Sequence, residues 1–395
     1  MNTTRNNFVR QEISMFRWIS LLIAVLTLQG AQAGTLLKRI HVDHAFRYGG
    51  GEWEIVIHGN DGDPDLDPEK VVMVVIDQPF PSEGGRATRP SSGQWDFLGV
   101  GANEDIWLIP QAFTPLLWPG WRTEGRFAEY FDSDPRLGFT SRFVKISLEG
   151  VTYSGLGAGH FSIWSNQTGG VTKQWISSAD GITEEDGYYF SSGHAHNNFG
   201  FSDPGVYRVD YSASAFLSND GGSPPAGTNP VTSPVQSFYY AVGTYAEWKA
   251  SYFEPHELVD GDPVDDSPEV AHYHSDTDQD GVSLLLEYAF NLSPVEMDSK
   301  VLVPWEGTSG LPAVQFDDSD NGKRLVIEYV RRRSRGAPRL SYHPEFSSSL
   351  DAEWADGVSE TVSPVDATWE RVRVVDPVAA GGESARFGRV RVELE

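Results

Sequence analysis

An acidic segment near the middle of the chain has the residue types and spacing of a calcium-binding loop. Side-chain oxygens fall at loop positions 1, 3 and 5, a glycine at 6 allows a sharp turn, a backbone carbonyl falls at 7, and a carboxylate that can bind in a bidentate manner falls at 12. The residues at these positions are Asp276, Asp278, Asp280, Gly281, Val282 and Glu287. The spacing predicts a Ca²⁺ site, and the alternative is a solvated acidic turn.

Histidines are concentrated in the first half of the chain and suggest a second metal site. His194 and His196 alternate, so in a strand both imidazoles face the same side. Two histidines at this spacing can chelate one transition metal ion, and His41 with Asp43 offers a similar pair if the two strands are neighbours. We predict a zinc-type site at His194 and His196, with help from His41, Asp43 or His160. The alternative is that these side chains hydrogen-bond to backbone near sheet ends.

Tryptophans in the same region raise a second class of function, in which aromatic rings stack on sugars. The candidates for a glycan platform are Trp95, Trp107, Trp118, Trp121 and Trp164. Several of them alternate with apolar residues, which favours core packing. An enzyme is not predicted, because no nucleophile elbow, His-Glu-x-x-His motif or phosphate-binding glycine loop is present.

Composition limits the partners. The formal net charge is −26, a surface that repels nucleic acid and anionic membranes. The basic cluster at Arg331, Arg332, Arg333 and Arg335 is therefore interpreted as a solvated strand end. The chain has no cysteine, so disulfides and cysteine metal ligands are excluded.

The first 33 residues are predicted to be an export signal. Three arginines precede an apolar run from Trp18 to Leu28, and Ala31-Gln32-Ala33 provides small residues for cleavage before Gly34. No later segment is apolar over the length that crosses a bilayer. We expect a mature chain without a transmembrane segment that is secreted, periplasmic or held at the cell surface.

The remaining pattern predicts a mostly β fold in which two β-sandwich domains flank a short helical connector. Alternating strand signals between turn residues occupy residues 34–245, and similar signals return over residues 295–395. The intervening residues 246–294 have helix propensity on both sides of the calcium loop. Expected strands include Trp53 to Ile57, Val71 to Val75, Val206 to Tyr211, Leu325 to Val330, Arg339 to Tyr342, Arg371 to Val375 and Phe387 to Val392.

Several motifs of the first predicted domain occur in an order that resembles a known family. They are His41 to Asp43 with Trp53 to His58, Phe97 to Gly99 with Ile106 to Gln111, Gly120 to Glu124, Gly157 to Trp164, and Gly193 to Phe201 with Pro204 to Tyr207. Together they resemble the surface-anchored protein family called choice-of-anchor M, which includes the actinobacterial wall-anchored repeat.

The resemblance implies an exported bacterial protein with no established enzymatic activity. It also implies an association with metal-type ABC transporters. This association favours metal binding by the histidines more than their spacing alone does. Phe199 stands where the family usually has Trp, and the chain ends at Glu395 without an anchor helix or sorting motif. We therefore expect secretion or periplasmic residence.

Residues from Trp248 onward are similar to C-terminal regions common in Verrucomicrobia and Planctomycetes, where an acidic loop leads into a Leu-Leu-Glu-Tyr-Ala helix and a β-domain follows. The loop also looks like a single dockerin or thrombospondin type 3 unit, and it is unpaired here, so we do not expect a calcium sensor. The sequence as a whole predicts a non-enzymatic envelope or secreted protein that acts in binding or surface display through an envelope protein or glycan partner. The alternatives are a zinc-type metal-binding protein associated with metal ABC transport and a glycan-binding surface module.

Overall fold

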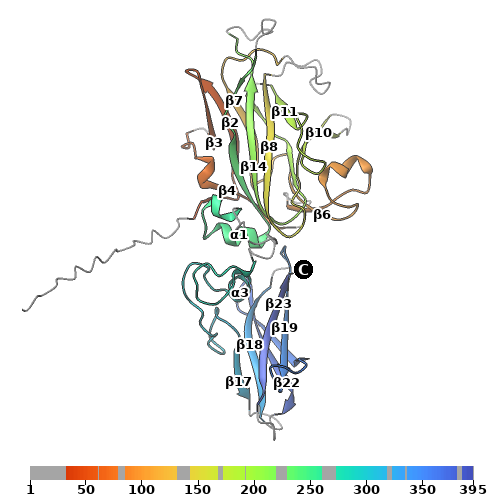
Figure 1. The fold of residues 1–395 in the computed structure, drawn as a ribbon, viewed down its shortest axis with the longest axis vertical. Coiled ribbons are helices and arrows are strands. Elements are labelled where there is room, and N and C mark those ends of the chain that lie inside the picture. Colours follow the sequence, from red (N-terminus) through yellow and green to blue (C-terminus); the bar gives the residue numbers. More distant parts are fainter. Residues whose placement is uncertain are drawn as a thin grey trace, which may run out of the picture. The chain divides into compact units, whose positions relative to one another are not determined.

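β-Strands are the main secondary structure of the described residues, as the alternating runs predict (Figure 1). The computed structural model describes residues 33–60, 62–78, 85–130, 143–167, 172–191, 193–218, 229–259, 273–317, 323–333, 336–379 and 385–394. All of these belong to one compact unit, Ala31–Glu395. The predicted export signal, apart from Ala33, lies outside the described residues, as does Arg335 of the basic cluster.

Three sheets are formed by the strands before residue 243. The largest has the order β1-β4-β16-β14-β8-β11, with β15 paired to β14. Its strands are β1 (Thr35–Leu37), β4 (Val71–Val75), β16 (Gln236–Val242), β14 (Gly205–Ala215), β8 (Val144–Gly155), β11 (Gly187–Phe190) and β15 (Val231–Thr232). The five-stranded sheet contains β10 (Thr172–Ser177), β9 (Phe161–Asn166), β13 (Asn198–Phe201), β6 (Asp105–Ile109) and β5 (Gly85–Thr88).

The third of these sheets has the order β12-β7-β2-β3 and positions the predicted zinc ligands. Its strands are β12 (Gly193–Ala195), β7 (Trp118–Glu124), β2 (His41–Gly49) and β3 (Glu52–His58). β2 runs parallel to β7 and antiparallel to β3, so it is paired on both sides. β12 is paired with β7 alone and forms the edge.

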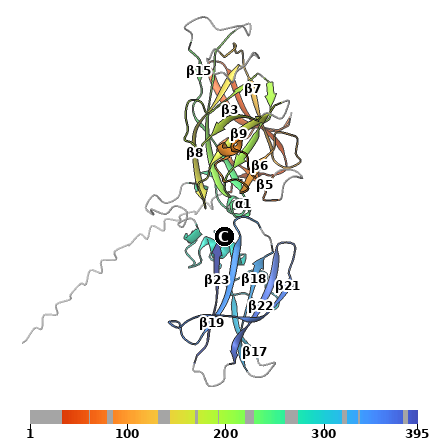
Figure 2. The same cartoon turned by 90° about the vertical axis from the view of Figure 1, so that its right-hand side faces the viewer.

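Two further sheets follow residue 312. One contains β17 (Ala313–Asp317), β18 (Arg324–Arg332), β22 (Trp369–Ala379) and β21 (Val358–Pro364), and the other contains β20 (Ala355–Asp356), β19 (Leu340–Ser347) and β23 (Phe387–Leu394) (Figure 2). Leu325, Ile327 and Tyr329 of β18 pack with Phe346 of β19 in a buried cluster. The predicted strands in this part of the chain are confirmed, with β19 beginning at Leu340, one residue later than expected.

Short helices connect some of these strands. They are α1 (Thr244–Ala250), α3 (Leu284–Phe290) and the 3-10 turns η1 (Pro68–Lys70), η2 (Gly93–Leu98) and η3 (Pro255–Leu258). The connector predicted over residues 246–294 is helical only in part before the calcium loop, because α1 ends at Ala250 and Pro255 follows five residues later.

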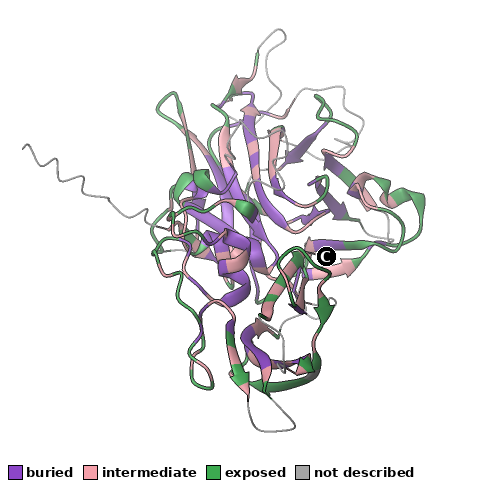
Figure 3. Ribbon diagram, turned by 60° about the horizontal axis from the view of Figure 1, so that its bottom comes forward, coloured by how far each residue is buried: buried purple, intermediate pink, exposed green. Residues whose placement is uncertain are grey.

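Burial is greatest where the first sheets pack together (Figure 3). The core is rich in aromatic rings, and the wholly buried ones include Trp121, Tyr207, Tyr211, Tyr240, Phe161 and Phe199. Trp107 and Trp164 are buried as well. These two and Trp121 cannot form an exposed sugar platform, so the glycan alternative fails for these three, and the core packing that their alternation favours is confirmed for them.

A buried carboxylate joins the first group of strands to the loop before β19. Asp77, whose side chain is 1% exposed, accepts a hydrogen bond from the backbone N–H of Ala337 at 2.5 Å and another from Trp107 Nε1 at 3.2 Å. The guanidinium of Arg86 lies 3.6 Å away. The Asp77 side chain therefore accepts from a backbone N–H that lies 260 residues later in the sequence.

Replacing Asp77 by Ala should lower the free energy of unfolding by about 2 kcal/mol, because two donors lose their acceptor. Urea denaturation measures the change, and Glu69→Ala, at an exposed position on η1, serves as the control and should shift stability by less than about 0.5 kcal/mol. Equal stability of the two variants would show that the Asp77 contacts contribute nothing.

Candidate metal centres

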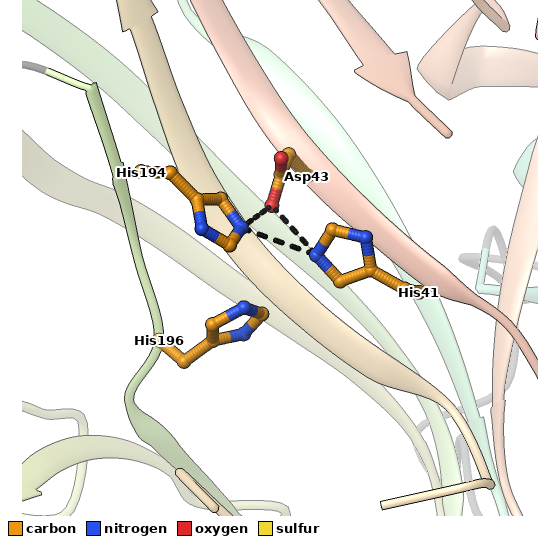
Figure 4. A group of neighbouring side chains, drawn as sticks. All are labelled: His41, Asp43, His194 and His196. Carbon is orange, nitrogen blue, oxygen red and sulfur yellow. Dashed lines mark hydrogen bonds and ion pairs between the residues drawn. The ribbon is translucent and has the colours of Figure 1, made fainter. Parts of the chain in front are cut away.

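Four of the five predicted zinc ligands meet on one face of the β12-β7-β2-β3 sheet (Figure 4). His41 and Asp43 alternate along β2, and His194 and His196 alternate along β12 and the residue after it, so each pair faces the same side. One donor atom from each of the four residues lies within 4.8 Å of the others.

The donor atoms are spaced like the ligands of one small metal ion. His194 Nε2 lies 3.0 Å from Asp43 Oδ1 and 3.1 Å from His41 Nε2, and His41 Nε2 lies 3.5 Å from the same carboxylate oxygen. Bonds of 2.0–2.1 Å to a tetrahedral Zn²⁺ place neighbouring ligands about 3.3–3.4 Å apart. The observed separations bracket that value.

His196 is held in the orientation that a metal ligand needs. Its Nδ1–H donates to the carbonyl of Pro119 at 3.0 Å, and its ring lies flat on Trp118 at 3.7 Å with an interplanar angle of 1°. Nε2 is buried and has no hydrogen-bond partner in the part of the chain that the structure describes. A backbone acceptor on one ring nitrogen fixes the tautomer that offers the other nitrogen to a metal.

Burial shifts the pKa values of His196, His41 and Asp43. It lowers the pKa of His196 to about 4, despite the hydrogen bond to Pro119, and it lowers the pKa of His41. Burial also raises the pKa of Asp43, although His194 and His41 oppose the shift. Neutral imidazoles around a buried carboxylate supply lone pairs without a compensating positive charge, and a divalent ion would provide that charge.

Gly120 makes the cluster possible, because β7 lies between the two strands that provide the ligands. The sequence predicts that His41 and Asp43 join the site if their strand pairs with the strand of His194. In the structure, β7 lies between β2 and β12. A Cβ on Gly120 would lie 2.3 Å from Asp43 Oδ1 and 2.9 Å from His196 Cε1. The side chains therefore meet across a strand only where that strand has no side chain.

A buried histidine supports Gly120 from the opposite face of the sheet. His44 Nδ1–H donates to the Gly120 carbonyl at 2.9 Å, and Nε2 accepts from the Tyr240 hydroxyl at 2.7 Å. Complete burial lowers the pKa of His44 to about 4, which keeps its ring neutral. His44 therefore stabilises the backbone beneath the ligands and is not itself a ligand.

His160 does not join the cluster. Its ring lies against Gly99, and its backbone N–H donates to Ser202 Oγ at 2.7 Å. Sequence reasoning missed the contributions of Pro119, Trp118 and Gly120 to the site. No spacing rule marks them, since their roles depend on which strand lies between β2 and β12.

The predicted calcium loop brings three aspartates together. Carboxylate oxygens of Asp276, Asp278 and Asp280 lie within 4.8 Å of one another. Asp276 accepts from the N–H of Gly281 at 2.9 Å, and Asp280 accepts from the N–H of Val282 at 2.9 Å. Gly281 has a φ of +90°, a conformation that glycine adopts without strain.

Glu287 is the second indication of a cation at this loop. The residue is completely buried in α3, and neither carboxylate oxygen has a hydrogen-bond partner among the described residues. Burial, together with the charges of the three aspartates, raises its pKa to about 8. A buried carboxylate without donors carries a large desolvation cost, which a bound Ca²⁺ would offset.

The described arginines of the basic cluster contact carboxylates, an aromatic ring and a backbone carbonyl of the protein. Arg331 pairs with Glu370 at 2.6 Å and with Glu360 at 3.0 Å, and the Arg332 guanidinium lies 3.7 Å from the centre of the Tyr288 ring. Arg333 donates to the carbonyl of Asp366 at 2.7 Å. These contacts place the arginines at strand ends, as predicted, but Arg332 is half-buried against Tyr288 and Trp369 and is therefore only partly solvated.

Comparison of the chain with protein-family models finds no match, and comparison with curated proteins finds none either. The resemblance to choice-of-anchor M therefore stays a prediction. None of the described helices is long and apolar enough to cross a membrane.

Gly120→Ala should abolish metal binding at the histidine cluster, because the new methyl group would occupy the space between Asp43 and His196. Isothermal titration with Zn²⁺ measures the loss. Gly49→Ala is the matched control, since a Cβ there meets no atom within 4 Å. Unchanged Zn²⁺ affinity in Gly120→Ala would mean that the ion does not bind between these two side chains.

Calcium-free protein should lose stability as pH rises from about 5 to 8. In that range the folded chain keeps a proton on Glu287, whose pKa is about 8, whereas the unfolded chain, with the usual value of 4.5, has released it. Protonation therefore favours the folded state at low pH, and the benefit is lost as pH approaches 8. Melting temperatures measured in EDTA across this range test the slope.

Calcium should remove this slope by replacing the proton, and Glu287→Gln should abolish both the slope and the stabilisation by calcium. Glu296→Gln, at an exposed position, is the control. If calcium stabilises Glu287→Gln as much as the unmodified protein, Glu287 is not a ligand.

Proposed function

We propose that this chain is an exported, non-enzymatic bacterial envelope or secreted protein that binds one transition metal ion at His41, Asp43, His194 and His196. The observation that carries the proposal is the convergence of three imidazole nitrogens and one buried carboxylate oxygen within 4.8 Å of one another, with separations of 3.0–3.5 Å among the donor atoms of His41, Asp43 and His194. Neither solvation nor backbone hydrogen bonding requires four such groups to face one another.

The donor set favours zinc over the hard cations. Imidazole suits Zn²⁺ and its neighbours in the transition series, whereas Ca²⁺ and Mg²⁺ take oxygen ligands. Four protein donors match the coordination number of a closed tetrahedral site, and catalytic zinc sites usually keep only three. Binding or transfer of the ion is therefore favoured over hydrolysis, in agreement with an association with metal ABC transport, which the family resemblance implies.

We further infer that two β-sandwich domains, over residues 34–245 and 295–395, flank a connector that binds Ca²⁺ at Asp276, Asp278, Asp280, the carbonyl of Val282 and Glu287. The buried carboxylate of Glu287 supports this inference. The connector leads into an aromatic cluster in which Tyr288 packs on Tyr245 and Trp248, and the Tyr288 hydroxyl donates to Thr244 Oγ1 at 2.8 Å. Calcium would thus hold the helix that carries these contacts.

Zinc titration of chelator-treated protein tests the proposed function. In buffer with saturating calcium, the protein should bind one Zn²⁺, and the double variant His194→Ala with His196→Ala should bind at least about 100-fold more weakly. His256→Ala, which removes an exposed imidazole far along the chain, is the control and should bind normally. Equal binding by the double variant and the unmodified protein would refute the proposal.

A further inference from the structure

The four proposed metal ligands differ in how firmly the sheet holds the strands that carry them. His41 and Asp43 belong to β2, which is hydrogen-bonded to β7 on one side and to β3 on the other. His194 belongs to β12, an edge strand of three residues that, among the described residues, pairs only with β7. Two ligands are therefore fixed within a sheet, and one lies at its border.

His196 directly follows β12 in sequence, and contacts outside that strand fix its side chain. Beyond the hydrogen bond to Pro119 and the stack on Trp118, the next residue is buried Asn197, whose Oδ1 accepts from Trp121 Nε1 at 2.9 Å. The chain then continues into β13 within the five-stranded sheet. Movement of His196 would disturb all of these contacts.

His194 has the weakest independent support of the four. Its side chain is 45% exposed, compared with 26% for His41 and 2% for Asp43. Its hydrogen-bond partners among the described residues, Asp43 and His41, are both reached through Nε2, and Nδ1 makes no hydrogen bond to any residue that the structure describes. Histidines that bind a metal permanently nearly always donate from the second ring nitrogen to an acceptor. The orientation of His194 thus depends on the other ligands.

We propose that His194 is the exchangeable ligand of the site, whose departure opens one coordination position on an ion still held by His41, Asp43 and His196. This rests on the proposed metal-binding function. In the exchange, the bond from Nε2 to the ion breaks, its lone pair stays on the imidazole, and a lone pair from water or from an external imidazole takes its place. Neither the oxidation state of the ion nor the charge of the protein changes.

His41 is the alternative exchangeable ligand, and its position argues against that role. It lies on the doubly paired strand, and its ring is packed 5.2 Å from the Trp118 ring and 5.2 Å from the His196 ring. Its departure would require the paired strand to move or the ring to leave this packing. An open position at His194 instead faces solvent, where an accepting protein or a small donor can reach it.

Single variants tested with Co²⁺ as a spectroscopic substitute for zinc distinguish the ligands. His194→Ala should still bind one Co²⁺, with affinity lowered about 10- to 100-fold and with faster transfer to a chelator. Added imidazole should fill the open position, restore the visible absorption of the unmodified protein and slow the transfer. His196→Ala, His41→Ala and Asp43→Asn should lose most of their binding, and imidazole should not restore it.

The outcomes separate this inference from the function on which it rests. Failure of the unmodified protein to bind Co²⁺ or Zn²⁺ would overturn the proposed function itself. Binding by the unmodified protein, together with equal losses in all four folded variants or with no response of His194→Ala to imidazole, would overturn only the assignment of His194. Far-ultraviolet circular dichroism and melting temperatures establish that each variant is folded before its binding is compared.

Discussion

The missing side chain at Gly120 is the constraint on which the histidine cluster depends. Adjacent strands lie about 4.8 Å apart, so β2 and β12, with β7 between them, are separated by about 9.6 Å, too far for direct side-chain neighbours in a flat sheet. Asp43 and His196 lean over the intervening strand and meet in the space that a Cβ would fill. His44 and Tyr240 hold the same glycine from below, so the aromatic core and the polar face share one backbone position.

Two groups of candidate metal ligands lie in different parts of the chain, and they offer different donor atoms. The strand-borne cluster offers nitrogen and one carboxylate, whereas the loop before α3 offers carboxylates only. Calcium, a hard ion, prefers oxygen donors, whereas transition metals such as zinc bind well to imidazole nitrogen, so the two donor sets suit different cations. The chain has a net charge of −26, which attracts cations electrostatically, and it has no cysteine that could form a disulfide cross-link.

The sequence predicted features whose cause is local and left open those that depend on the pairing of distant strands. The calcium loop is contained in twelve consecutive residues, so its spacing alone placed Asp276, Asp278 and Asp280 together. Alternation alone placed His194 beside His196. The pairing of these with His41 and Asp43 required knowledge of sheet order, which alternation does not contain, and for the same reason His160 was included although it packs on Gly99.

Because β12 lies at the edge of its sheet, metal binding by its histidine has a further consequence. An unpaired strand edge presents backbone N–H and C=O groups that can recruit a strand from another molecule. β12 covers β7 at Trp121, Arg122 and Thr123, and besides these backbone pairs it is held by the contacts of His194 with Asp43 and His41. Ligation would therefore also protect the protein against self-association, and the availability of a trace metal would affect its solubility.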